Sequence, residues 1–130
     1  MKKYNKIVLT GASGRLGSYL REPLSKITKK LVSTDKDDIG KTLHNEVFKK
    51  LNIKNFKDVN KILKKTDLII HFGGYSNEGP FQEILDSNIL GTYNIWKSAK
   101  KNKIKRIIFA SSIHSVGMYR VNEVINHKVM

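Results

Sequence analysis

Short runs of apolar residues alternate along this chain with longer segments in which apolar positions recur every three or four residues. These two spacings match the side-chain periods of strands and helices, so they predict five strands and three helices. The expected strands are Lys6–Thr10, Lys30–Thr34, Val47–Leu51, Asp67–Phe72 and Arg106–Ala110. The expected helices are Arg15–Ile27, Phe56–Lys64 and Phe81–Lys101.

The order of these elements predicts a parallel sheet. Asp67–Phe72 and Arg106–Ala110 are apolar runs bounded by charged residues, which is typical of strands buried on both faces of such a sheet. Strands that alternate with helices through right-handed crossovers predict an α/β fold, a Rossmann-like doubly wound sheet of about five strands in the order 3-2-1-4-5. The 130 residues fit one domain, residues 1–130.

Ligands bind such sheets outside the carboxyl ends of the strands, where the strand order reverses. Gly11–Gly17, Phe72–Ser76 and Ser111–Gly117 follow the first, fourth and fifth expected strands. The sequence therefore predicts one cleft lined by all three segments.

Side-chain positions can also be predicted for the longest helix and for one histidine. Tyr93 and Trp96 follow the apolar spacing of the helix, so we expect both in the core, with Gly91 allowing close backbone packing. His71 lies in an apolar strand, where a hydrogen-bonded core residue is a better interpretation than a ligand.

The turn after the first strand carries glycines spaced GxxGxxG, at Gly11, Gly14 and Gly17. A strand that ends in a glycine turn and opens into a helix can hold a diphosphate, because the first helical N–H groups lack partners and glycine lets the ligand approach. The alternative is an ordinary loop, since glycines also cluster in turns.

An acidic residue ends the second expected strand. Asp35 follows the glycine turn by about 20 residues, where a carboxylate accepts hydrogen bonds from the ribose hydroxyls of a dinucleotide. A carboxylate repels the 2′-phosphate of NADP, so Asp35 favours NAD, and Lys36 beside it softens that preference. The alternative role for Asp35 is that of a turn residue at a strand end.

Composition narrows the function classes. Lys and Arg number 25 against 11 Asp and Glu, a formal charge of +14. Arginine, the residue expected at a phosphate- or base-reading surface, is scarce, so a solvated lysine surface is favoured over a nucleic-acid site. The chain has no cysteine, no histidines at metal-ligand spacing, no signal peptide pattern and no apolar run of about 20 residues. We therefore expect a cytoplasmic protein without a metal or a membrane partner.

Several motifs together resemble the extended short-chain dehydrogenases/reductases, the NAD-dependent epimerase/dehydratase family. Two segments, Gly73–Phe81 and Phe109–Tyr119, are most similar to the uronate (hexuronic acid) dehydrogenases within it. The motifs that carry the resemblance are Thr10–Gly17, Asp35, His71–Gly74, Asn88–Thr92 and Phe109–Ser112.

The resemblance implies a reaction and a set of roles. The reaction is the NAD-dependent oxidation of a hexuronic acid at C1 to the aldarolactone. Ser112 is implied as the catalytic serine, with Ser76 and His114 contacting the sugar. The cofactor residues implied are Gly11, Ser13, Gly14, Arg15, Leu16 and Gly17 at the diphosphate, Asp35 at the ribose, Asn52 and Ile53 near the adenine, and Phe72, Gly73 and Gly74 towards the nicotinamide.

The family's base, a tyrosine with a lysine four residues later, has no counterpart after the last strand. Tyr93 and Lys97 have that spacing but precede the strand, and the residue four positions after Tyr119 is Glu123. In addition, Ile113 replaces an asparagine of the uronate enzymes. We therefore expect a cofactor-binding part of a longer enzyme, ending before the tyrosine helix and substrate lobe, with little activity alone.

Two further classes stay open beside the uronate enzyme. One is a sugar-nucleotide epimerase or dehydratase that shares the same cofactor half, with a sugar nucleotide in place of the sugar acid. The other is a non-catalytic NAD-binding module. The last expected strand, Arg106–Ala110, should also end the sheet at an uncovered edge, which favours aggregation or a homo-oligomer.

Overall fold

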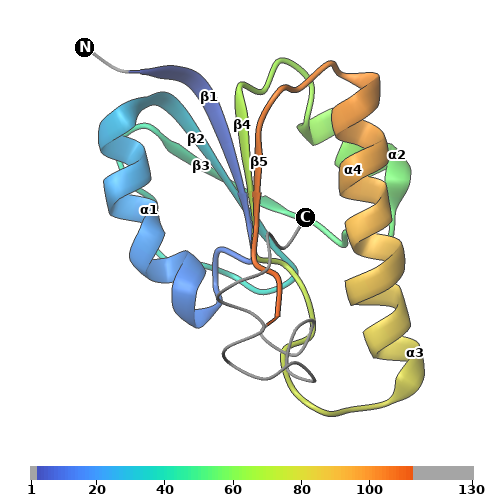
Figure 1. Ribbon diagram of the computed structural model, residues 1–130. Helices are drawn as coiled ribbons and strands as arrows, with labels where there is room; N and C mark the ends of the chain where they lie inside the picture. Colours follow the sequence, from blue (N-terminus) through green and yellow to red (C-terminus); the bar gives the residue numbers. More distant parts are fainter. Residues whose placement is uncertain (1–2, 113–130) are drawn as a thin grey trace, which may run out of the picture.

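The computed structural model describes residues 3–112, which form a five-stranded sheet with helices on both faces (Figure 1). The elements in chain order are β1 (Tyr4–Thr10), α1 (Arg15–Ile27), β2 (Thr28–Asp35), β3 (Glu46–Lys50), α2 (Phe56–Ile62), β4 (Leu68–His71), α3 (Phe81–Ile84), η1 (Leu85–Gly91), α4 (Thr92–Lys101) and β5 (Ile107–Phe109). The residues of α1 match the prediction, and most other boundaries differ by one or two residues.

The strands are all parallel and lie in the order β3-β2-β1-β4-β5, as the sequence predicts. In the central register Val8 of β1 pairs with Val32 of β2 on one side and Ile69 of β4 on the other. Because the strands are parallel, the carboxyl ends of β1, β2 and β4 lie on the same side of the sheet. The strand order reverses between β1 and β4, so the ligand position typical of this fold lies at their carboxyl ends.

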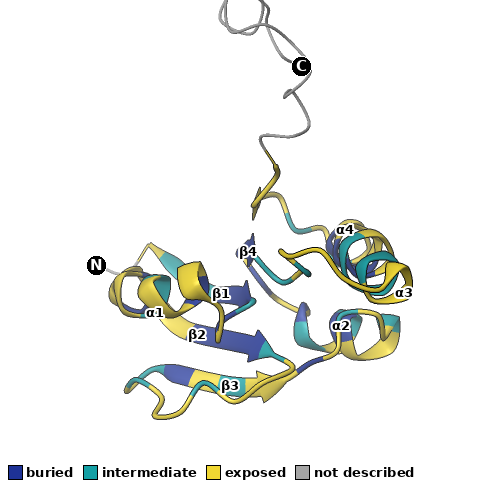
Figure 2. Ribbon diagram, turned by 90° about the horizontal axis from the view of Figure 1, so that it is seen from below, coloured by how far each residue is buried: buried dark blue, intermediate teal, exposed yellow. Residues whose placement is uncertain are grey.

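Two apolar clusters hold the helices against the sheet, because successive side chains of a strand point to opposite faces. Figure 2 shows buried positions concentrated in β1, β2 and β4, with α1 on one face and α2 and α4 on the other. The cluster under α1 contains Ile7, Leu9, Ala12, Leu24, Leu31, Leu68 and Ile70. The cluster under α2 and α4 contains Val8, Val32, Leu51, Val59, Leu63, Ile69, Ile95 and Ala99.

The predicted long helix is present, but a π-helical segment, η1, divides it. The expectation that Tyr93 and Trp96 belong to the core is wrong, since they are 56% and 42% exposed. The buried face of α4 instead carries Asn94, Ile95, Ser98 and Ala99. A π-turn inserts one extra residue into the helix. The residues after it are therefore rotated by about 100° from the positions that a continuous α-helical spacing predicts.

The last strand also differs from its prediction. Every residue of β4 is buried, as expected, whereas Ile108 and Phe109 of β5 are 48% and 42% exposed. The reason is position in the sheet, since β5 pairs only with β4 and forms its edge among the described residues. The expected open edge is therefore present in this part of the chain.

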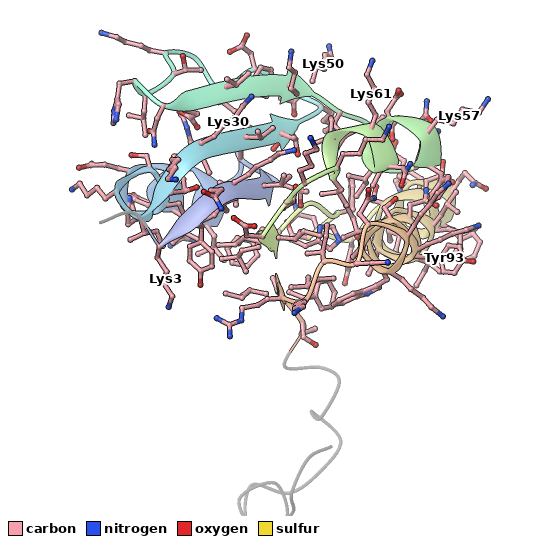
Figure 3. The ribbon with its side chains drawn as sticks, turned by 90° about the horizontal axis from the view of Figure 1, so that it is seen from above. Lys3, Lys30, Lys50, Lys57, Lys61 and Tyr93 are labelled. Atoms are coloured by element: carbon pink, nitrogen blue, oxygen red, sulfur yellow. The ribbon has the colours of Figure 1, made fainter. Side chains whose placement is uncertain are left out.

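The lysines mostly lie on the surface. Figure 3 shows Lys30 and Lys50 on the strands and Lys57 and Lys61 on α2, all of them exposed. Lys6 differs, because its Nζ donates to the carbonyls of Ile62 and Lys64 at the end of α2, at 2.6 and 2.9 Å. Burial and then the neighbouring charge of Lys30 lower the pKa of Lys6. The labelled lysines are therefore solvated, and the choice between a solvated surface and a nucleic-acid site stays a prediction.

One buried ion pair ties α1 to the start of β3. Arg21 donates from Nε and Nη2 to the two carboxylate oxygens of Glu46, each at 2.8 Å, and the Glu46 side chain is fully buried. Arg21 also donates to the carbonyls of Ile39 and Lys41. Its guanidinium therefore holds the long β2–β3 connection, which has no helix of its own.

Replacing Arg21 by methionine should lower the free energy of unfolding by about 3–5 kcal/mol, because the Glu46 carboxylate is left buried without its cation. Urea unfolding at pH 7 measures the change. Lys26→Met is the matched control, since it breaks the exposed Lys26–Glu22 pair and should leave the free energy of unfolding nearly unchanged. Equal effects of the two variants would contradict this account.

Candidate functional site

A cleft of about 600 Å³ lies at the carboxyl ends of the strands. It brings together the turn after β1, the end of β2, the loop after β3, the loop after β4 and part of η1. The predicted residues that line it are Gly11, Ser13, Gly14, Arg15, Leu16, Gly17, Asp35, Asn52, Ile53, Phe72, Gly73, Gly74 and Ser76. Two of the three predicted segments therefore converge as expected.

The third predicted segment does not reach the cleft in the part of the chain that the structure describes. Its first residues, Ser111 and Ser112, are exposed and do not line the cleft, although Ala110 just before them does. His114 and the rest of Ser111–Gly117 beyond Ser112 lie outside the described residues.

Two glycines of the first turn are required by the fold itself. Gly11 has a φ of +72°, and a Cβ there would lie 2.6 Å from the carbonyl carbon of Phe72. A Cβ at Gly17 would overlap the Gly11 carbonyl oxygen. Gly14 differs, because its Cβ would meet only that oxygen, at 3.2 Å, and its position is otherwise open. Its lack of a side chain leaves space for a ligand.

The start of α1 offers a positive electrostatic end to this open space. Gly14 is the N-cap, no side chain accepts a hydrogen bond from the first helical N–H groups, and the first turn carries no acid. The unpaired N–H groups and the helix dipole therefore attract an anion. Arg15 in the first turn and on the cleft wall adds a formal charge. This arrangement suits a phosphate or diphosphate.

Asp35 faces the same cleft from the end of β2. Its Oδ2 accepts from the N–H of Ser13 at 2.9 Å, and its Oδ1 accepts from the N–H of Lys36 at 2.7 Å. These bonds fix the carboxylate beside the glycine turn. A carboxylate has about four lone-pair positions, so acceptor capacity remains for a hydroxyl donor in the cleft.

The side chain of Asn88, a residue with no predicted role, holds the loop after β4 through two hydrogen bonds. Asn88 accepts from the N–H of Tyr75 at 2.7 Å and donates to the Tyr75 carbonyl at 2.9 Å. A Cβ on Gly74 would come within 2.9 Å of the Asn88 Oδ1 atom. The signal in the sequence was a polar residue inside the apolar stripe of a helix, within the Asn88–Thr92 motif.

The rim of the cleft is closed on one side by an ion pair. The Nζ of Lys54, after β3, lies 3.1 Å from the Oδ2 of Asp86 in η1, and both residues line the cleft. This bond and then one from Gln82 lower the pKa of Asp86. The Lys54 side chain is half exposed and that of Asp86 a quarter exposed, so the pair contributes little to stability and its main effect is to link two parts of the cleft lining.

His71 lies directly behind the loop after β4 and is fully buried, as predicted for a core histidine. Its Nδ1 is 2.7 Å from Thr10 Oγ1, and its Nε2 is 3.3 Å from Thr92 Oγ1. Burial lowers the pKa of His71 from 6.5 to about 4. The imidazole is therefore neutral at pH 7.

The described residues contain no helix long and apolar enough to cross a membrane. Within the same residues, no three His, Cys, Asp or Glu side chains group in a way that could hold a metal ion.

A doubly wound parallel sheet, with a glycine turn and an acidic second strand end in one cleft, defines the class of Rossmann-like dinucleotide-binding domains. The model of the NAD dependent epimerase/dehydratase family matches residues 7–127. The chain belongs to this family.

Relatives within the family include uronate dehydrogenases. That of Pseudomonas syringae pv. tomato is 39% identical over 125 residues, which cover 95% of this chain and 45% of the relative. That of Agrobacterium fabrum is 36% identical over 118 residues, 91% of this chain and 44% of the relative. The chain thus spans about 45% of the length of the first of these relatives.

Solved structures show the same relationship. The glucuronic acid dehydrogenase of Chromohalobacter salexigens superposes with a TM-score of 0.84 at 35% identity, over 89% of this chain and 44% of that one. A mutant uronate dehydrogenase of Agrobacterium tumefaciens complexed with NAD gives 0.79 at 35% identity, over 83% and 41%. These likenesses confirm the predicted fold class and the predicted resemblance.

The buried His71 predicts a pH dependence of stability. Between pH 6.5 and about 4 the unfolded chain binds a proton that the folded chain does not, so stability falls as the pH falls. Above pH 6.5 the imidazole is neutral in both the folded and the unfolded chain, so the free energy of unfolding is not reduced. By pH 4 the free energy of unfolding has fallen by about 3 kcal/mol.

His71→Gln should remove this loss, which urea unfolding across the pH range measures against wild type. The exposed His44 provides the control, because His44→Gln should keep the wild-type slope. An NMR titration of the His71 imidazole in the folded protein gives a direct check, and a midpoint near 6.5 would contradict the prediction.

Proposed function

We propose that this domain binds NAD and forms the cofactor half of a uronate dehydrogenase. One observation carries the proposal: the uncapped start of α1, the open position at Gly14 and the Asp35 carboxylate all face one cleft. A helix N-terminus holds a diphosphate, and a carboxylate one strand away accepts hydrogen bonds from the attached ribose.

The residues present fit NAD as the cofactor. The Gly14 position is a cradle that a side chain would fill, and the amides of Arg15, Leu16 and Gly17 begin the helix beside it. The negative charge of Asp35 repels a 2′-phosphate, which favours NAD over NADP. When bound, NAD supplies the hydride acceptor, and the protein supplies its position and electrostatics.

The other residues that line the cleft would contact the two ends of the cofactor. The Asn52 and Ile53 loop would lie against the adenine, and the backbone of Phe72–Gly74 would lie towards the nicotinamide. All of these residues line the cleft, and they follow β3 and β4, which lie on either side of β1 in the strand order. A dinucleotide lying across the carboxyl ends of the strands would contact both.

The substrate we propose is a hexuronic acid, oxidised at C1 to the aldarolactone by the whole enzyme. Ser76 lines the cleft and would contact the sugar, and His114 would contact it from beyond the described residues. Ser112, just after β5, would donate a hydrogen bond to the reacting oxygen, which fixes its position for hydride transfer. Support comes from uronate dehydrogenases at 36 to 39% identity.

A sugar-nucleotide epimerase or dehydratase is the second candidate. A dTDP-D-glucose 4,6-dehydratase of Dictyostelium discoideum is 29% identical over 143 residues, below the uronate dehydrogenases. Both functions use the same cofactor cleft, so the sugar separates them. A hexuronate that shifts the amide of Ser76 in the NAD complex, where UDP-glucose does not, would favour the sugar acid.

Gly14→Ala should fold like wild type and bind NAD at least about tenfold more weakly, a loss of about 1.4 kcal/mol. The backbone of Gly14, at φ −68° and ψ 166°, accepts an alanine. The added methyl would meet only the Gly11 carbonyl oxygen, at 3.2 Å, and we expect it to occupy part of the cleft proposed for the diphosphate. Calorimetric titration with NAD measures the affinity, and thermal melting measures the fold.

Gly17→Ala is the contrasting variant, because its methyl overlaps the Gly11 carbonyl and should lower stability before any ligand is added. NADP should bind wild type more weakly than NAD does. The proposal fails if the folded wild-type chain shows no NAD-dependent heat or amide shift, or if Gly14→Ala binds NAD as wild type does.

A further inference from the structure

A buried histidine joins several elements that surround the end of β4. His71 ends β4, its side chain reaches Thr10 at the end of β1, and its other ring nitrogen reaches Thr92 at the start of α4. Its ring also stacks on Phe109 of β5, with centroids 5.5 Å apart and planes 24° apart. One imidazole thus contacts β1, α4 and the strand that leads to Ser112.

The donors and acceptors in this group can be assigned from one backbone bond. The N–H of Gly73 donates to Thr10 Oγ1 at 3.0 Å, so this hydroxyl acts as an acceptor there. Thr10 is buried, and among the described residues the only acceptor within hydrogen-bond distance of its hydroxyl proton is the Nδ1 of His71. A buried hydroxyl proton without an acceptor is costly, so Thr10 donates to Nδ1.

The tautomer of His71 follows from this direction. Because Nδ1 accepts, the ring proton of the neutral imidazole is on Nε2, which donates to Thr92 Oγ1. The burial that lowers the His71 pKa to about 4 keeps this form neutral across the physiological range. The chain of bonds runs from the Gly73 N–H through Thr10 and His71 to α4, with one direction throughout.

The segment held at the end of this chain forms one wall of the cleft. Phe72 donates its N–H to the Thr10 carbonyl at 3.2 Å, next to the side-chain bond from Gly73. On the other side, the N–H of Ala110 donates to the His71 carbonyl at 3.2 Å. The imidazole itself reaches the 72–74 backbone through Thr10 and the end of β5 through the Phe109 ring, so a shift of the imidazole would disturb both.

We propose that His71, as the Nε2–H tautomer bonded to Thr10 and Thr92, is a positioning residue that holds the Phe72–Gly74 backbone and the end of β5 for the nicotinamide half of NAD. This inference rests on the proposed function. It assigns the Thr10–His71 pair to one half of the ligand, whereas the glycine turn serves the diphosphate.

The test compares NAD with ADP, which carries the adenosine and diphosphate but no nicotinamide. Thr10→Val removes the hydroxyl that links Gly73 to His71 and keeps the shape of the side chain. We expect the NAD dissociation constant to rise about five- to tenfold, as for the loss of one buried hydrogen-bond link, and the ADP constant to stay within about twofold. Thr10→Ser should restore wild-type NAD affinity.

A spectroscopic signature separates positioning from a general loss of stability. The imidazole nitrogens of wild-type His71 should give the ¹⁵N shifts of a protonated Nε2 and an unprotonated Nδ1 at pH 7. The difference between the ¹⁵N shifts of Nδ1 and Nε2 should become smaller in Thr10→Val and return to the wild-type value in Thr10→Ser. Thr92→Val, which removes the partner of Nε2, is the second variant if Thr10→Val does not fold, and it should also weaken NAD more than ADP.

Thr66→Val is the control, because this buried hydroxyl, just before β4 at the far end of the strand, has no hydrogen-bond partner among the described residues. It should leave both affinities unchanged. Equal weakening of NAD and ADP by Thr10→Val, or a proton on Nδ1 in wild type, would overturn the inference alone. Wild-type protein that binds ADP and NAD equally would also overturn it, and protein that binds neither would refute the proposed function as well.

Discussion

The contact between the glycine turn and the end of β4 is the constraint on which the cleft depends. Gly11 lies so close to Phe72 that no Cβ fits between them, and the Phe72 N–H donates to the Thr10 carbonyl. Since the two chain segments touch through backbone atoms, the first amides of α1 and the loop after β4 line the same space. A side chain at Gly11 would push these walls apart and separate the proposed diphosphate and nicotinamide regions.

The glycines of this turn meet different physical demands. Gly11 and Gly17 are needed by the folded chain whether or not a ligand is bound, because a Cβ would strike the backbone at both. A Cβ at Gly14 would meet only the Gly11 carbonyl oxygen, so packing does not by itself require glycine there. In the proposed function this position serves the ligand, and a substitution series can separate the packing role of Gly11 and Gly17 from the proposed binding role of Gly14.

The electrostatics of the cleft are local, although the chain is strongly basic. The formal charge of +14 comes mainly from lysines, and those labelled on the strands and α2 in Figure 3 are exposed. Charges farther than about 8 Å are screened at physiological salt, so such lysines raise the rate of encounter with an anion more than they fix its position. In the proposed function, position depends on groups in the cleft itself: the helix start and Arg15 at the diphosphate, and Asp35 at the ribose.

The sequence by itself determined the strand order, the glycine turn, the place of Asp35 in the cleft and the burial of His71. Each of these depends on a local pattern of residues or on the right-handed crossover between parallel strands. Tertiary structure decided the outward direction of Tyr93 and Trp96, the Asn88 brace and the partners of His71. The phase of α4 depends on η1, where Gly91 leaves room for Ile53 from a distant loop. Thr10 and His71 are 61 residues apart, and only the packed sheet brings their side chains together, because a hydrogen bond requires a distance that no local pattern specifies.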